Sequence, residues 1–170
     1  MATTTIRNAL AGIEEYFQSD QARGPRPDTP ATAVVETGLR CRVQAPDGKA
    51  VYTDMSEAFG GRAEFNSPGW LARAALASCD ATGLAMRAIR LGIELDSVEV
   101  SVEASSDGRG LFLDEGISPG SCDLRVQFRV AARDVPREQI QEMVDWVVAH
   151  SPVGCDFEQP VEFEVELELI

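Results

Sequence analysis

Two periods of apolar spacing divide this chain into elements. Over residues 4–19 apolar side chains recur every three or four positions, which predicts an amphipathic helix that ends before Gln21. The Pro- and Gly-rich stretch over residues 24–30 then predicts an extended linker. We therefore expect residues 1–31 to form an N-terminal helix and linker, attached to a main domain over residues 32–170.

Beyond residue 32 the spacing changes to every second position, as in half-buried β-strands. The first alternating run continues without a break from Val35 to Val43 and predicts one strand. A turn over residues 46–49 joins this strand to a short second one near residues 51–53. Three later alternating runs also predict strands, at residues 98–102, 124–130 and 161–169. A long Gly-rich loop is expected over residues 105–121.

Two internal helices are predicted from their start signals. Ser67 and Pro68 suit the cap and first turn of a helix over residues 69–91, and Pro136 begins a second helix that ends near His150. The first of these consists mostly of small and apolar residues, so we expect protein to surround it almost completely.

The predicted order of elements after the N-terminal helix is β-β-α-β-β-α-β. This order describes an α+β fold in which helices pack on antiparallel sheet. The last strand alternates apolar residues with four glutamates, and we expect this acidic face to pair with Arg125 and Arg129.

The charge of the chain excludes several classes of partner. It contains 28 acidic and 15 basic residues, which gives a formal charge of −13 near pH 7. Nucleic acids and anionic membranes both require basic patches, so we predict neither as a partner. No apolar run is long enough to span a membrane, and residues 1–20 lack the pattern of a secretion signal. We expect a cytoplasmic protein of ordinary globular composition.

One of the four cysteines stands out by its surroundings. Cys41, Cys79, Cys122 and Cys155 are widely spaced without a CxxC pair, which in a reducing cytoplasm does not predict a disulfide framework. Cys79 lies among small residues of the central helix, and Gly83 one turn later leaves room for a pocket at the sulfur. The alternative is that Cys79 is a small core residue, as most free cysteines are.

The remaining thiols and the single histidine give weaker signals. We interpret Cys41 as a core residue and Cys122 as the start of a strand. His150, Cys155 and another cysteine offer zinc ligands, but the spacing is unspecific, and His150 suits the C-terminal end of the preceding helix. We therefore predict no metal and no cofactor.

Several motifs resemble one known family. The run NSPGWLARAALASC, from Asn66 to Cys79, is similar to the central helix of the OsmC/Ohr family, the osmotically induced and organic hydroperoxide resistance proteins. The similarity includes the Gly38-Leu39-Arg40 run, Gly92-Ile93, the strand at residues 98–100 and the run His150-Ser151-Pro152-Val153, and it covers residues 33–170. The resemblance implies an OsmC-like fold, an intertwined homodimer, and two interface thiols that reduce organic hydroperoxides.

The resemblance also assigns a role to Cys79 and exposes two departures. Cys79 matches the family thiol that peroxide oxidises to a sulfenic acid, which a second thiol then converts to a disulfide. Ser151 stands where that second thiol normally lies, and a hydroxyl cannot resolve a sulfenic acid. Gly69 stands where the hydroperoxide resistance branch has a glutamate that helps to orient an arginine.

Two further residues are candidates for the site. Arg40 best matches the family arginine, because a guanidinium stabilises a thiolate and binds the charge that develops on a peroxide oxygen. The alternative for Arg40 is an exposed strand arginine. Cys155, four residues beyond Ser151, is the candidate for a displaced resolving thiol, and the alternative is a partly buried loop cysteine.

We predict from these features an OsmC-like thiol peroxidase that reduces organic hydroperoxides by a one-cysteine mechanism, with electrons from an external thiol or dithiol. Phe59, Phe65 and Trp70 flank the start of the central helix, either as the lining of an apolar substrate channel or as core and dimer packing. The alternative function is a non-catalytic OsmC-like protein that binds a small apolar or thiol-bearing ligand. A purely structural module is the third class.

Overall fold

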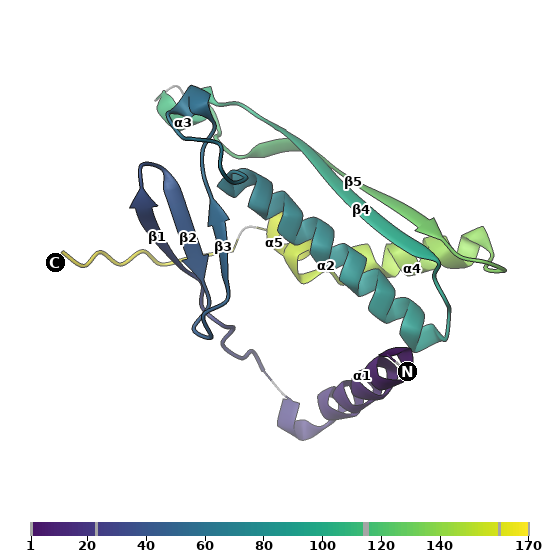
Figure 1. The fold of residues 1–170 in the computed structure, drawn as a ribbon. Coiled ribbons are helices and arrows are strands. Elements are labelled where there is room, and N and C mark those ends of the chain that lie inside the picture. The colour runs from purple at the N-terminus through teal and green to yellow at the C-terminus, as the bar shows by residue number, and fades with distance from the viewer. Residues whose placement is uncertain (1, 23, 114–115, 160, 170) are drawn as a thin grey trace. The chain divides into compact units, whose positions relative to one another are not determined.

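The computed structural model describes residues 2–22, 24–113, 116–159 and 161–169 (Figure 1). The chain divides into two compact units, one that runs to Ala75 and one that starts at Leu76. Helix α2, Pro68–Leu91, crosses the boundary between them. Each unit contains its own antiparallel sheet, with three strands in the first and two in the second.

The first unit begins with α1, Ala2–Gln18, and a 3-10 turn, Asp20–Ala22, so the predicted N-terminal helix is confirmed. Its sheet has the order β1-β2-β3. The three strands are Thr32–Thr37, Arg40–Gln44 and Ala50–Thr53. A second 3-10 turn, η2, Glu57–Phe59, lies in the loop that connects β3 to α2.

The prediction of one continuous strand from Val35 to Val43 is wrong. The segment is a hairpin in which Thr37 of β1 pairs with Arg40 of β2. The chain reverses at Gly38, whose φ of 62° is readily adopted by glycine. The alternating pattern continues through the turn, so it gave no sign of the reversal.

The second unit packs helices on one hairpin. Strands β4, Ser97–Ser106, and β5, Ser121–Ala131, pair in antiparallel register, and helix α4, Arg137–Ala149, follows them (Figure 1). These elements confirm the predicted strands near residues 98–102 and 124–130 and the second amphipathic helix. The buried core joins α2 to α4 through Leu84, Ala88, Met143 and Val147. Apolar residues of both strands, including Val98 and Phe128, pack against this core.

Two short helices were not predicted. Helix α3, Arg109–Phe112, lies in the expected loop between β4 and β5, of which residues 114 and 115 are outside the described residues. Helix α5, Pro152–Glu158, follows α4 almost directly. Its start has the ordinary signals, Ser151 as the cap and Pro152 in the first turn.

The predicted last strand is also wrong, because the described residues 161–169 form neither strand nor helix. Their apolar side chains are exposed, with Phe163 at 84% and Leu167 at 83%. The expected pairing with Arg125 and Arg129 does not form. Arg129 instead forms an ion pair with Glu99 at 3.0 Å, and Arg125 lies opposite Glu103 in the β4–β5 register.

Helix α2 buries only one face in the single chain. Its buried residues follow helical spacing, at Leu76, Asp80, Leu84 and Ala88, while Trp70 is 45% exposed. The prediction that protein surrounds this helix almost completely is therefore wrong for one chain. The described elements after α1 have the order β-β-β-α-β-β-α apart from the two short helices and the 3-10 turns, and the α+β class with antiparallel sheets is confirmed.

Candidate functional site

Cys79 lies in the second unit, on α2, and is half-buried. The space left by Gly83, one turn later, is filled by the side chain of Val147 on α4. A Cβ atom at Gly83 would lie 3.2 Å from Cγ1 of Val147, so the glycine allows α4 to approach α2 closely. The expectation that Gly83 opens a pocket beside the sulfur is thus replaced by a role in helix packing.

Cys79 contacts Ser151, the residue at the position where the resemblance places the family's second thiol. The Ser151 hydroxyl donates to Sγ of Cys79, with an Oγ–Sγ distance of 3.6 Å. Ser151 is only 4% exposed. The structure therefore brings the two motif positions together across the second unit, with a hydroxyl in place of the second sulfur.

The backbone at the start of α5 fixes the Ser151 hydroxyl. Ser151 caps this helix, and its Oγ accepts a hydrogen bond from the Gly154 amide at 3.0 Å. A Cβ atom at Gly154 would lie 2.9 Å from Cβ and 3.0 Å from Oγ of Ser151, too close for the present position of the serine. The absence of a side chain at Gly154 is therefore what allows the hydroxyl to occupy this place.

Charged residues of α2 lie close to Cys79 in sequence. Asp80 is 2% exposed, and its Oδ1 is buried with no hydrogen-bond partner among the described residues. Two turns later the Arg87 guanidinium lies over the ring of Trp146, 4.5 Å from its centroid. His150 stacks on that same ring, and its Nδ1 lies 2.7 Å from the Trp146 carbonyl oxygen. The expected place of His150 at the end of a helix is confirmed.

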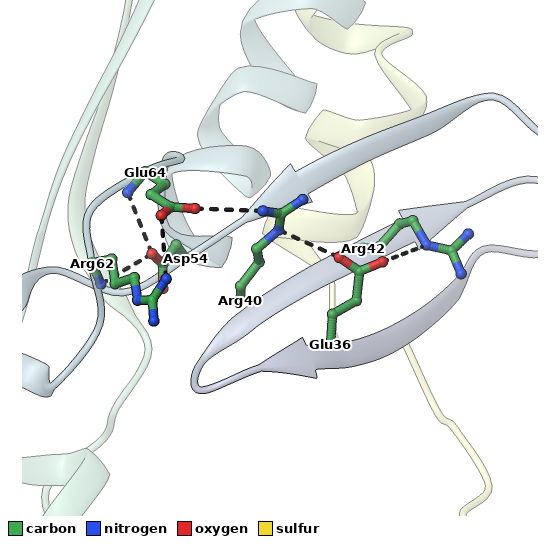
Figure 2. Close-up of polar contacts among 6 residues, drawn as sticks. All are labelled: Glu36, Arg40, Arg42, Asp54, Arg62 and Glu64. Carbon is green, nitrogen blue, oxygen red and sulfur yellow. Dashed lines mark hydrogen bonds and ion pairs between the residues drawn. The ribbon is translucent and has the colours of Figure 1, made fainter.

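Arg40 lies in the first unit, at the start of β2, held by two carboxylates (Figure 2). Its Nε lies 3.4 Å from Glu36, and its Nη1 lies 3.5 Å from Glu64. The guanidinium also lies over the rings of Tyr52 and Phe65, 4.9 Å and 5.1 Å from their centroids. The Arg40 side chain is 36% exposed.

The carboxylate of Asp54 anchors the loop that carries Glu64 (Figure 2). Asp54 is 2% exposed and accepts hydrogen bonds from the amides of Met55, Arg62 and Glu64. Burial by itself raises the pKa of Asp54, but these three amides and the charge of Arg62 outweigh it, so the pKa lies below the ordinary 3.8. Neither Asp54 nor Glu64 was singled out from the sequence, because an isolated acid in a loop has no characteristic spacing.

An aromatic pocket lies in the same unit. It has a volume of about 360 Å³ and is lined mainly by Tyr52, Phe65, Trp70 and Leu71, with Glu64 on its wall. Tyr52 and Phe65 stack with ring centroids 5.1 Å apart. Two of the three predicted aromatic residues therefore share one pocket, while Phe59 lies on η2 and does not line it.

The other cysteines have different surroundings. Cys155 is exposed on α5, one turn beyond Ser151, and Cys79 and Cys155 are both free thiols. Cys41 is half-buried in β2, and Cys122 is exposed, with its thiol 3.3 Å from the Ser105 carbonyl oxygen. Among the residues that the structure describes, no three His, Cys, Asp or Glu side chains lie together as metal ligands would.

The sequence of the region that holds Cys79 and Ser151 also matches a known family. Residues 61–166 match the family described as OsmC-like protein. The chain belongs to the OsmC-like protein family. Within this OsmC-like chain the matched region contains all of α2, α4 and α5, whereas Arg40 and Asp54 precede it.

Solved structures share the fold of this OsmC-like chain. The OsmC-like protein of Mycoplasma pneumoniae is 14% identical, with a TM-score of 0.68 over 80% of this chain and 91% of that one. An organic hydroperoxide resistance protein of Elizabethkingia anophelis is 17% identical, with a TM-score of 0.60 over 82% and 94%. The organic hydroperoxide resistance protein OsmC of Legionella pneumophila is 19% identical, with a TM-score of 0.56 over 77% and 89%.

Two negative findings complete the comparison. No curated protein sequence matches this chain. Among the described residues, no helix is both long enough and apolar enough to cross a membrane.

Proposed function

We propose that this OsmC-like chain is a thiol-dependent peroxidase that reduces organic hydroperoxides in oxidative stress defence, with Cys79 as the peroxidatic thiol. The contact between Cys79 and Ser151 carries the proposal, because it pairs a half-buried thiol with a hydrogen-bond donor at the two motif positions. Family membership and fold neighbours named as organic hydroperoxide resistance proteins support the substrate class.

The reaction begins at the Cys79 sulfur. The thiolate attacks the distal oxygen of the hydroperoxide, an S–O bond forms and the O–O bond breaks. The leaving alkoxide takes a proton and departs as an alcohol, so the peroxide gains two electrons and Cys79 becomes a sulfenic acid. An external thiol then forms a mixed disulfide with Cys79 and releases water, and a second thiol frees Cys79 and leaves as a disulfide.

The external reductant is required by the residue at position 151. The Ser151 hydroxyl lies against Cys79 but has no sulfur with which to form a disulfide. Cys155 remains the candidate for a displaced resolving thiol within this mechanism, since it is exposed and lies on the same short helix as Gly154. Treatment with one equivalent of hydroperoxide distinguishes the two routes, because only the second gives a peptide that links Cys79 to Cys155.

Arg40 is the arginine that we propose to bind the developing peroxide charge. Its guanidinium is held by Glu36 and Glu64 and lies over two aromatic rings, an arrangement that fixes its orientation. The aromatic pocket lined by Tyr52, Phe65 and Trp70 suits the apolar body of a lipid or aryl hydroperoxide.

We further propose that the chain works as an intertwined homodimer in the cytoplasm. The apolar residues of the 161–169 segment are exposed by more than 60% in one chain. Pairing with a partner chain would bury this apolar surface. Free thiols at the exposed Cys122 and Cys155 suit a reducing compartment. Residues 1–31 then form an appendage to the OsmC-like domain over residues 32–170.

The proposal is tested by measuring the loss of cumene hydroperoxide in the presence of a dithiol. The full-length chain should consume the peroxide, and Cys79→Ser should not. Cys122→Ser is a matched control, because it removes a free thiol at a different place in the fold and should leave the rate unchanged. The proposal is overturned if the unmodified chain shows no consumption that depends on Cys79.

One observation favours a second function, a binding protein without catalysis. Cys79 is not among the residues that line the pocket at Trp70, and both Ser151 and Gly69 depart from the family pattern. Titration of a Trp146→Phe variant with a small apolar or thiol-bearing ligand would report the fluorescence of Trp70 alone. Saturable quenching in a chain that consumes no peroxide would establish this function.

A further inference from the structure

Ser151, which replaces the family's second thiol in this chain, places a hydrogen-bond donor beside the Cys79 sulfur. Ser151 loses the resolving role of a thiol, but its hydroxyl has a proton that a neutral or charged sulfur can accept. We propose that Ser151 is a catalytic residue, whose hydroxyl donates a hydrogen bond to the Cys79 thiolate and stabilises it for attack. Its catalytic meaning rests on the proposed peroxidase function, whereas the interaction itself does not.

The direction of the Ser151 hydrogen bond is set by its partners. The Gly154 amide, at 3.0 Å, has only a hydrogen to offer, so Oγ is the acceptor there. The hydroxyl hydrogen is then left for the Cys79 sulfur at 3.6 Å. At 4% exposure Ser151 has almost no contact with water that would compete for this hydrogen. The hydroxyl is therefore preset as a donor toward the sulfur.

A hydrogen-bond donor at Cys79 would offset the unfavourable charge close to it in sequence. Asp80, the next residue on α2, is buried, and its charge would oppose a thiolate. The Arg87 guanidinium lies over the Trp146 ring, and Nδ1 of His150 contacts the Trp146 carbonyl oxygen. The Ser151 hydroxyl, by contrast, donates a hydrogen bond directly to the sulfur.

Removal of the hydroxyl is the first test. The readout is the rate at which iodoacetamide alkylates Cys79, measured by peptide mass spectrometry as a function of pH in the full-length chain. Ser151→Ala should move the midpoint of this profile to higher pH by about one unit, since hydrogen bonds to charged groups have this order of strength. The profile of Ser67→Ala should stay in place.

Ser67 is a matched control because it makes the same kind of cap. Its Oγ accepts the Trp70 amide at 3.2 Å at the start of α2, about three turns before Cys79. Both substitutions remove a cap, and only one removes the donor. A purely structural role for Ser151 would give equal losses of thermal stability and no change in the alkylation profile, and this result would overturn the proposal.

A second variant keeps the hydroxyl but displaces it. Gly154→Ala places a Cβ atom where Ser151 now lies, so the alkylation midpoint should again rise although the serine is retained. This variant also decides the matter if Ser151→Ala does not fold. An alkylation profile identical to that of the unmodified chain would contradict the inference.

The alkylation assay needs no peroxide, so the two claims fail separately. A shifted midpoint in a chain that consumes no hydroperoxide supports the Ser151 interaction and removes the proposed function. Hydroperoxide consumption that is unchanged in rate and in pH dependence by Ser151→Ala overturns the inference and leaves the function in place.

Discussion

At the scale of single residues, position 151 determines how an oxidised Cys79 can be reduced again. A thiol at this place could form a disulfide with Cys79, whereas the hydroxyl present here donates a hydrogen bond to its sulfur. The same position also caps α5, so one side chain connects the start of this helix to the Cys79 sulfur. In the proposed mechanism, the oxygen of Ser151 in place of a sulfur is what makes an external reductant necessary.

Ser151→Cys should restore internal resolution of the sulfenic acid. Oγ lies 3.6 Å from the Cys79 sulfur, and a disulfide needs about 2.05 Å, so a shift of about 1.5 Å suffices. After one equivalent of hydroperoxide, peptide mapping should show positions 79 and 151 joined. The measurement is best made in a Cys155→Ser background, which removes the displaced thiol as a competitor. A sulfenic acid that persists at Cys79 in this variant would show that the two positions do not approach.

At the scale of elements, the loop between β3 and α2 is organised by one buried carboxylate. Asp54 accepts three backbone amides, and the last of them belongs to Glu64, which in turn holds Arg40 (Figure 2). Gly61 lies within this loop, and a Cβ atom there would lie 2.0 Å from the Met55 carbonyl oxygen. The orientation of Arg40 therefore depends on a loop that tolerates little change.

Asp54→Asn should loosen this loop. The amide side chain turns an N–H group toward backbone donors, so trypsin should cleave after Arg62 faster than in the unmodified chain. The stability lost is greatest near neutral pH. The pKa of Asp54 is lowered by folding, so its contribution is full above pH 3.8 and disappears as the pH falls through the folded value.

Asp47→Asn is the control for loss of a charge. The Asp47 carboxylate interacts with Lys49 in the exposed β2–β3 turn, and this pair lowers its pKa as well. Its loss should leave cleavage after Arg62 unchanged. Equal cleavage in the two variants would contradict the anchoring role of Asp54.

Elements with an unambiguous start signal or alternation pattern were predicted correctly from the sequence. The Ser-Pro start and apolar content of α2 and the alternation of β4 and β5 each led to the observed element. The β1–β2 hairpin was missed because a two-residue turn leaves the alternation of Val35, Thr37 and Leu39 undisturbed. Residues 161–169 show that alternation alone does not make a strand, since a strand also needs an edge to pair with.

The candidate site was predictable only in part for a related reason. Cys79 and position 151 were identified from sequence motifs, but the hydrogen bond between them spans 72 residues and depends on the closeness of α2 and α5. The carboxylates that hold Arg40 come from β1 and from a loop without a pattern. Long-range contacts of this kind have no period that a sequence can display.

For the whole molecule, net charge and exposed apolar surface have opposite effects on solubility. The net charge of −13 favours solubility, and four of the acids alternate with apolar residues in the 161–169 segment. Those apolar side chains are largely exposed, with Val165 at 82% and Leu169 at 86%. Such a segment is more stable when paired with another strand.

The proposed homodimer should therefore depend on the apolar face of this segment. The unmodified chain should have the mass of two copies by light scattering, and Val165→Glu combined with Leu167→Glu should reduce it to one. Glu164→Gln with Glu166→Gln changes the opposite face of the same segment and should leave two copies. A single-copy mass for the unmodified chain would exclude the dimer.

In the proposed mechanism, hydroperoxide oxidises Cys79 to a sulfenic acid that persists until an external thiol reduces it. The most direct measurement treats the full-length chain with one equivalent of cumene hydroperoxide, without any thiol, and traps sulfenic acids with dimedone before peptide mass spectrometry. Dimedone should be found on Cys79, together with a matching loss of peroxide. Unmodified Cys79 beside unconsumed peroxide would contradict this mechanism.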